Sequence, residues 1–132
     1  MASILRVNTL TDASSNNSTA MSTINQGTAK AWSHVAAGGA SLPDSFNCSS
    51  IDDDGTGEYG INFSNNMGSA NYSATSTITF SPDGTNQLRS FFPESKATTS
   101  VEMDHNFINA SNQTQAYDIE TNGSLVIHGD LA

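Results

Sequence analysis

Hydrophobic and polar residues alternate with a period of two along much of this 132-residue chain. The clearest run is EYGINF, in which Tyr59, Ile61 and Phe63 fall on one side and polar or small residues on the other. The segments 70–80 and 97–108 alternate in the same way. Side chains of a β-strand point to opposite faces in turn, so this period predicts strands with one buried face.

Turn residues separate the alternating segments at short intervals. Further strands are expected at 3–10, 29–35, 45–51, 115–120 and 124–130. About seven or eight short strands, with no helix of three turns between them, predict one all-β domain over residues 28–132. The expected fold is a single antiparallel β-sandwich or a jelly-roll-like domain. Its expected core consists of Tyr59, Ile61, Phe63, Tyr72, Ile78, Phe80, Val101, Phe107, Tyr117 and Val126.

The first 27 residues contain no aromatic residue and few large apolar ones. Residues 3–10 predict a strand, 11–20 a small-polar linker, and 21–27 either a short strand or a helical turn closed by Gly27. We expect residues 1–27 to form an extended N-terminal arm that adds a strand to a neighbouring protein. The alternative is that this arm pairs within its own sandwich. The expected docking residues are Ile4, Leu5, Val7 and Leu10.

Composition agrees with a β-rich fold and excludes some partners. The chain has 14 Asn, 20 Ser and 14 Thr, and these residues favour turns and exposed strand faces over helix interiors. Thirteen acids face four basic residues, for a formal charge of −9. Four scattered cations cannot build a basic patch, so we expect no binding to nucleic acid or to anionic membranes.

Cysteine content and the N-terminal sequence carry two further expectations. Cys48 is the one cysteine, which excludes an intrachain disulfide and predicts a small buried hydrophobe on a strand. The opening MASILRVNTLTD lacks a charged region followed by an apolar run, so we expect no signal peptide. No stretch approaches the roughly 18 apolar residues of a membrane span.

The acidic segment SSIDDDGTGEYGINFSNNM, residues 49–67, is the strongest candidate for chemistry. As an EF-hand it fails, because Phe63 occupies the position of the bidentate glutamate and strands flank the loop. A looser calcium site at Asp52, Asp54 and Glu58 remains an alternative. Adjacent aspartates in a glycine-flanked turn do not supply the fixed separation that glycoside hydrolysis needs. The preferred interpretation is a β-hairpin with the aspartates at its tip and glycines at the positive-φ positions.

Other residue types that carry chemistry form no recognisable pattern. His34, His105 and His128 are far apart, although neighbouring strands can bring two of them together for a metal. No Gly-x-Ser-x-Gly elbow and no phosphate-binding glycine loop is present. Trp32 is interpreted first as a core residue, and alternatively as a platform on which a sugar ring stacks. We therefore expect no catalytic residue, no metal and no cofactor.

Several segments share features with a known class of protein. The opening ILRVNTLTDASSNN and INQGTAKAW, the middle DSFNCSSIDDDGTGEYGINFSNNMGSANYSATST and the closing AYDIETNGSLVIHGDLA carry the likeness. Together they resemble a module of marine bacteriophage structural proteins, especially tail-fibre-like and appendage proteins. The resemblance covers nearly the whole chain, although each motif is short and rich in turn residues.

The resemblance implies a non-enzymatic phage virion protein, either a tail fibre or appendage or a capsid-decoration protein. Its implied partners are other virion proteins of the capsid, the tail or a neighbouring fibre subunit. By the same analogy we expect a homo-oligomer, with a trimer first. The alternative function is a receptor- or carbohydrate-binding module at a fibre tip, in which Trp32 contacts a host surface glycan. A depolymerase fragment is the enzymatic alternative.

Overall fold

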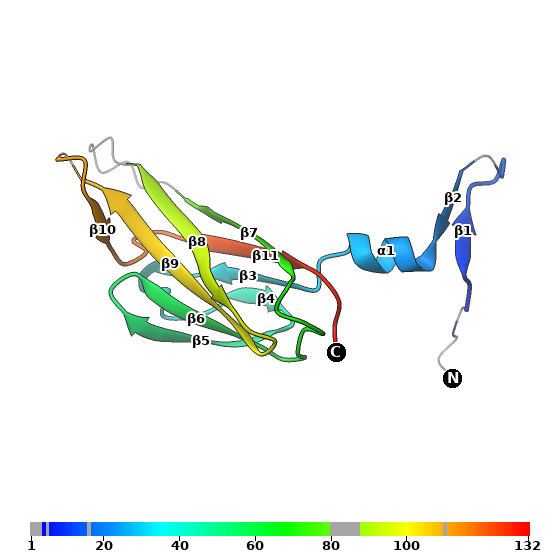
Figure 1. Ribbon diagram of the computed structural model, residues 1–132, viewed down its shortest axis with the longest axis horizontal. Helices are drawn as coiled ribbons and strands as arrows, with labels where there is room; N and C mark the ends of the chain where they lie inside the picture. Colours follow the sequence, from blue (N-terminus) through cyan, green and yellow to red (C-terminus); the bar gives the residue numbers. More distant parts are fainter. Residues whose placement is uncertain (1–3, 5, 16, 80–87, 110) are drawn as a thin grey trace.

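The computed structural model describes residues 4, 6–15, 17–79, 88–109 and 111–132. Two antiparallel sheets pack face to face, so the fold is the all-β sandwich that the alternation predicts (Figure 1). The four-stranded sheet has the order β4-β3-β11-β7. Its strands are β3 (Ala31–Val35), β4 (Asp44–Phe46), β7 (Ser73–Ile78) and β11 (Gly123–His128).

The second sheet has five strands in the order β10-β9-β6-β5, and β8 also pairs with β9. Its strands are β5 (Cys48–Gly55), β6 (Glu58–Phe63), β8 (Arg89–Lys96), β9 (Ser100–Ile108) and β10 (Thr114–Ala116). A short 3-10 helix, η1 (Ala37–Gly39), follows β3. Among the described residues, no helix has the length and hydropathy needed to cross a bilayer.

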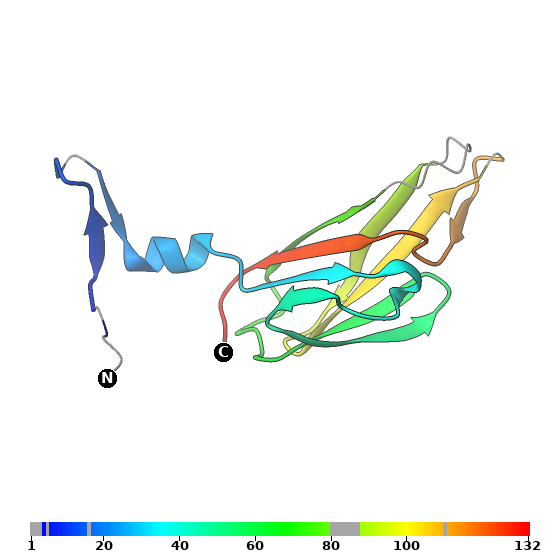
Figure 2. The same cartoon turned by 180° about the vertical axis from the view of Figure 1, so that it is seen from behind.

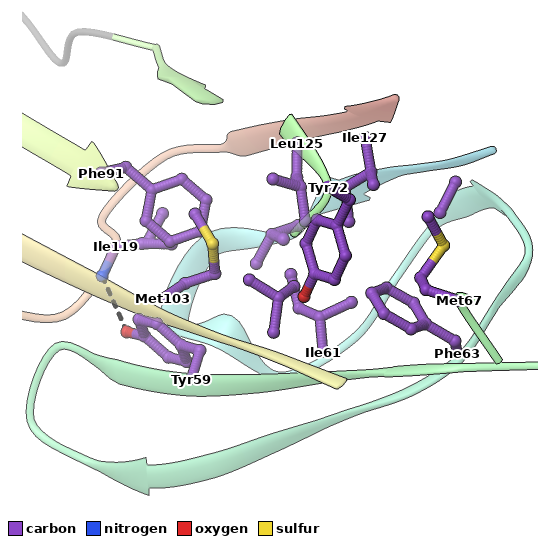
Figure 3. Packing of buried hydrophobic residues seen from close by; sticks show 13 residues of the cluster. Tyr59, Ile61, Phe63, Met67, Tyr72, Phe91, Met103, Ile119, Leu125 and Ile127 are labelled. Atoms are coloured by element: carbon purple, nitrogen blue, oxygen red, sulfur yellow. Dashed lines mark hydrogen bonds between the residues drawn. The ribbon is translucent and has the colours of Figure 1, made fainter. Parts of the chain in front are cut away.

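The core lies between the two sheets, where the inward strand faces meet (Figure 3). Half of the predicted core residues are there, namely Tyr59, Ile61, Phe63, Tyr72 and Val101, and Ile78 packs against the cluster while partly buried. Phe63 and Tyr72 contact each other edge to face, with ring centroids 5.9 Å apart. The buried apolar set consists of Ala31, Val35, Tyr59, Ile61, Phe63, Met67, Tyr72, Phe91, Val101, Met103, Ile119, Leu125 and Ile127.

The prediction that Val126 belongs to the core is wrong. β11 buries Leu125 and Ile127 completely, and because side chains alternate along a strand, Val126 points to the outer face. The segment SLVIH offers apolar residues to both faces, so the sequence does not show which face is buried. Phe80, another predicted core residue, lies outside the described residues.

Tyr117 and Phe107 also differ from the prediction. Tyr117 is exposed and Phe107 only partly buried, and their rings pack edge to face with centroids 5.1 Å apart. Tyr117 donates a hydrogen bond of 2.7 Å to Glu120, whose carboxylate is 2.7 Å from the Arg89 guanidinium. Arg89 also lies over the Tyr117 ring. The two aromatic residues therefore close one end of the sandwich together with an ion pair instead of filling its centre.

One chain segment connects the two sheets through a sharp corner at Asn47. β4 belongs to the four-stranded sheet and β5 to the other, and Asn47 between them has a φ of 55°. Asparagine tolerates this left-handed conformation better than most residues. The Asn47 side chain accepts a 2.8 Å hydrogen bond from the Asn65 backbone N–H, which holds the corner in place. The sequence pattern predicts one strand over 45–51, and the structure divides it here.

The N-terminal segment forms elements of its own. β1 (Thr9–Thr11) pairs with β2 (Ser18–Ala20) in a two-stranded hairpin, and α1 (Met21–Gly27) follows. Figures 1 and 2 show these three elements projecting from one end of the sandwich. The predicted linker at 11–20 in fact contains the last residue of β1, Thr11, and the whole of β2. β1 pairs with β2 and not with a strand of the sandwich. The alternative, in which the arm pairs within its own sandwich, is therefore wrong.

Candidate functional site

Trp32 lies on the outer face of the four-stranded sheet, not in the core. β3 alternates strictly, and its inward residues Ala31, Ser33 and Val35 are buried. Trp32 is half-buried between two strands, opposite Phe46 of β4 and Val126 of β11. We call Phe46, Trp32 and Val126 the aromatic row. The first interpretation of Trp32 as a core residue is therefore wrong.

A second cross-strand row runs beside the aromatic row on the same face. His34 of β3 lies opposite Asp44 of β4 and Ser124 of β11, and Ser124 in turn lies opposite Thr77 of β7. We call Asp44, His34, Ser124 and Thr77 the polar row. It contains a carboxylate, an imidazole and two hydroxyls, which together can donate and accept hydrogen bonds.

Phe46 is an exposed aromatic residue that the sequence analysis did not single out. It is 51% exposed, although alternation along the single strand expected at 45–51 would place it on the same face as Cys48. The turn in backbone direction at Asn47 separates the two, so Phe46 faces outward while Cys48 packs against the core. A positive φ at a non-glycine residue leaves no clear mark in the sequence, although Asn is the residue type in which to look for it.

The hairpin predicted from the three aspartates is confirmed, with one correction. β5 and β6 pair antiparallel, and the connecting glycines Gly55 and Gly57 have φ of 153° and 77°. The aspartates are not at the tip, because Asp52 to Asp54 are part of β5 itself, with Asp52 opposite Gly60. They lie along the outermost strand of the five-stranded sheet.

The calcium alternative finds no matching geometry. Asp52 accepts a 2.7 Å hydrogen bond from the Asn62 amide, whereas Asp54 lies beside Glu102 above Gly60. Burial raises the pKa of Glu102, and the neighbouring carboxylates of Asp54 and then Asp52 raise it further. Among the described residues, no group of three histidine, cysteine or carboxylate side chains is placed to hold a metal ion.

The three histidines do not meet. His105 is fully buried on the inward face of β9, and its Nδ1 is 2.5 Å from the Tyr117 carbonyl oxygen. Burial lowers the pKa of His105, which favours the neutral ring in a packing role. His34 is in the polar row, and His128 lies opposite Ser73 at the far end of β11.

Cys48 matches its predicted role as a small apolar residue on a strand. Its side chain is half-buried and packs against the core. Burial raises the pKa of the Cys48 thiol to about 11, so little thiolate exists at neutral pH. The structure therefore gives this cysteine no activated character.

The predicted docking residues of the arm are largely exposed. Ile4 is 75% exposed and Leu10 47% exposed, and Val7 is also exposed, while Leu5 lies outside the described residues. Leu10 belongs to β1, and Ile4 and Val7 precede that strand in the chain. The β1–β2 hairpin projects away from the sandwich (Figure 2). These three side chains form an exposed apolar surface that is separate from the aromatic row.

The aromatic row and the arm are thus two surfaces on which the described residues expose large apolar side chains. Both surfaces expose apolar side chains that a folded chain ordinarily buries or uses for binding. Comparison of the chain with protein families, with curated proteins and with solved structures finds no match.

Proposed function

We propose that this chain is a non-enzymatic structural component of a larger particle. Its N-terminal arm joins the chain to neighbouring subunits of that particle. The observation that carries the proposal is the projecting β1–β2 hairpin with its exposed apolar side chains. A two-stranded hairpin is only marginally stable alone in water. Burying a side chain such as Ile4 or Leu10 against a partner contributes roughly 1.5–3 kcal/mol. A partner that covers the arm therefore stabilises it and gains affinity at the same time.

The distribution of charge supports the same assignment. Residues 1–27 contain one cation, Arg6, and one acid, Asp12, so the arm carries no net charge. The remaining residues carry the whole formal charge of −9. Two sandwiches repel each other at close range, whereas a neutral arm can approach an acidic neighbour without this cost. The arm is thus the part of the chain best suited to contacts between copies.

The resemblance to phage appendage modules is the reason to place this assembly in a virion, as a tail fibre or appendage or as a capsid-decoration protein. We propose a homo-oligomer in which the arms of neighbouring copies meet, with three-fold symmetry by analogy with phage fibres. Locating the chain in an intact particle distinguishes a tail fibre or appendage from a capsid-decoration protein. Copies in the hundreds on the capsid indicate decoration, and a few dozen at the tail indicate a fibre.

The test of the arm is a truncation that removes residues 1–20. We expect the shortened protein to retain its circular dichroism spectrum and cooperative unfolding, and to lose self-association in light scattering. A point variant, Leu10→Ser, is expected to weaken association in the same assay. Leu88→Ser is its matched control. Leu88 is 70% exposed, but it directly precedes β8 of the sandwich and is not part of the arm.

Two outcomes contradict this proposal. If the truncated protein unfolds, the arm is part of the fold and not a docking device. If the full-length chain is monomeric at the concentrations reached on a particle, the arm does not join copies of the chain.

A further inference from the structure

No described element of the chain covers the outer face of the four-stranded sheet. In Figure 2 the sheet lies towards the viewer, and the arm leaves from its end without crossing it. The aromatic row and the polar row both lie on this face. We propose that it is a binding site for a neutral oligosaccharide, whose sugar rings stack on Phe46 and Trp32 and whose hydroxyls bond to the polar row.

The aromatic row supplies the stacking surface. The face of an aromatic ring carries negative charge density, which attracts the weakly positive C–H groups of a sugar ring. Phe46 is 51% exposed, so a sugar can reach its ring without any rearrangement of the core. Adjacent strands lie about 4.8 Å apart, so the row from Phe46 through Trp32 to Val126 extends over about 10 Å. That length accommodates a short oligosaccharide.

The polar row is placed to bind the edge of the same sugar. It is two residues further along each strand, about 7 Å from the aromatic row. Asp44 accepts hydrogen bonds, while His34, Ser124 and Thr77 can both donate and accept them. Recognition sites for small ligands commonly combine an apolar surface with a few such polar groups that fix the ligand's orientation.

The charge on this face selects a neutral ligand. Asp44 contributes a negative charge, and the molecule as a whole carries −9, so sulfated and other anionic sugars are repelled. The outer face of the five-stranded sheet is different in kind, because Asp52, Asp54 and Glu102 lie together there. The outer face of the four-stranded sheet therefore carries fewer charged side chains than that of the five-stranded sheet, which suits an uncharged polar ligand.

The extent of the apolar surface argues for a sugar over a protein. A stable protein interface buries about 800 Å² on each partner around an apolar centre. Here three side chains form a single apolar row, and two of them, Trp32 and Val126, are already half-buried. One row flanked by hydroxyls is too small for such a centre, yet it suffices for one or two stacked rings.

The experiment uses the full-length chain and its single tryptophan. Trp32 lies within the proposed site, so its fluorescence reports directly on occupancy. Immobilised neutral and anionic oligosaccharides are screened first, and the best neutral one is then titrated in solution. We expect a saturable change in Trp32 fluorescence and at least a tenfold higher Kd for Phe46→Ala. Phe92→Ala is the matched control, since Phe92 is 39% exposed on the opposite sheet, and its Kd should equal that of the unmodified chain.

Several results overturn the inference. One is that no neutral oligosaccharide binds, and another is that only anionic ones do. A third is equal affinity of Phe46→Ala and Phe92→Ala. If Phe46→Ala instead abolishes self-association in light scattering, a second copy of the chain occupies this face. Should Phe46→Ala fail to fold, a shift of the Trp32 indole NMR signal on adding the sugar to the unmodified chain supports the site, and no shift refutes it. These outcomes are independent of the arm, whose truncation is expected to leave sugar binding unchanged.

Discussion

At the scale of single residues, Tyr59 shows how one buried side chain connects distant parts of the sandwich. Its hydroxyl accepts a 3.0 Å hydrogen bond from the Ile119 N–H (Figure 3). The same hydroxyl lies 3.4 Å from an Asp118 carboxylate oxygen. The same carboxylate oxygen accepts a hydrogen bond from the Gly57 N–H. Tyr59 is 1% exposed, so these bonds satisfy a hydroxyl that is costly to leave unpaired.

Gly39 makes room for the Tyr59 ring, and substituting it should be severely destabilising. A Cβ added at Gly39 would lie 1.8 Å from Tyr59 Cε1, and the φ of Gly39 is +65°. Gly39→Ala therefore combines backbone strain with displacement of a buried ring. We expect a loss of at least about 3 kcal/mol in the free energy of unfolding, measured by urea denaturation.

Gly38→Ala is the control for this substitution. Gly38 also has a positive φ, +73°, but a Cβ there meets nothing within 4 Å. Only the backbone cost of about 1–2 kcal/mol should appear. Equal losses for the two variants would show that the Tyr59 contact contributes nothing to stability.

Glu102 should make stability fall as pH rises through the acidic range. Burial, and then the carboxylates of Asp54 and Asp52, raise the pKa of Glu102 in the folded state above the ordinary 4.5. The folded protein thus favours the protonated form. This contribution is fully present below the unfolded pKa and is lost as pH rises through the folded pKa. Glu102→Gln should therefore raise the urea midpoint at pH 7 and change it little below pH 4.5.

Asp130→Asn is the comparison for the loss of one negative charge, because Asp130 is exposed near the end of the chain. It should give a much smaller gain at pH 7. A Glu102→Gln variant that is no more stable than the unmodified protein at neutral pH contradicts the assignment.

At the scale of elements, β5 gives the three aspartates a role. β5 is an eight-residue strand at one edge of the five-stranded sheet, and its pairing with β6 shifts register between Cys48 and Ser50 and between Asp53 and Gly55. An exposed edge of this length can pair with another chain, and natural proteins block such edges with charges and bulges. We therefore expect the aspartates to keep the edge of β5 from pairing with another molecule.

Removing this charge should promote aggregation. The double variant Asp52→Asn with Asp53→Asn is expected to aggregate faster than the unmodified chain in light scattering at 37 °C. The control, Asp104→Asn with Asp130→Asn, removes the same charge away from β5: Asp104 lies on β9, between β6 and β8. If both pairs aggregate equally, net charge and not the edge is what matters.

At the scale of the whole molecule, the arm proposed to contact neighbouring subunits and the face proposed to bind a sugar lie in different places. The neutral arm projects from one end of an acidic sandwich, and the row of Phe46, Trp32 and Val126 lies on a sheet face that the arm does not cross (Figures 1 and 2). A molecule joined to neighbours through its arm leaves that face free for a ligand. The truncation at residue 20 and the Phe46→Ala titration test these two contacts separately.

The sequence by itself determined the fold class and the residues that share a face within each strand. Alternation is a local property of an extended backbone, so EYGINF could be assigned correctly from its own residues. The DG and TG pairs likewise predicted the β5–β6 turn, because only glycine adopts such φ values at little cost.

The tertiary structure decided which face of each strand is buried. β3 and β11 carry apolar residues on both sides, so alternation alone could not show that Trp32 and Val126 point outward. The corner at Asn47, which exposes Phe46, depends on a contact with Asn65, 18 residues further along the chain. The candidate sugar-binding face combines residues from four strands. No stretch of sequence contains it, because it exists only once hydrogen bonding between strands has set their register.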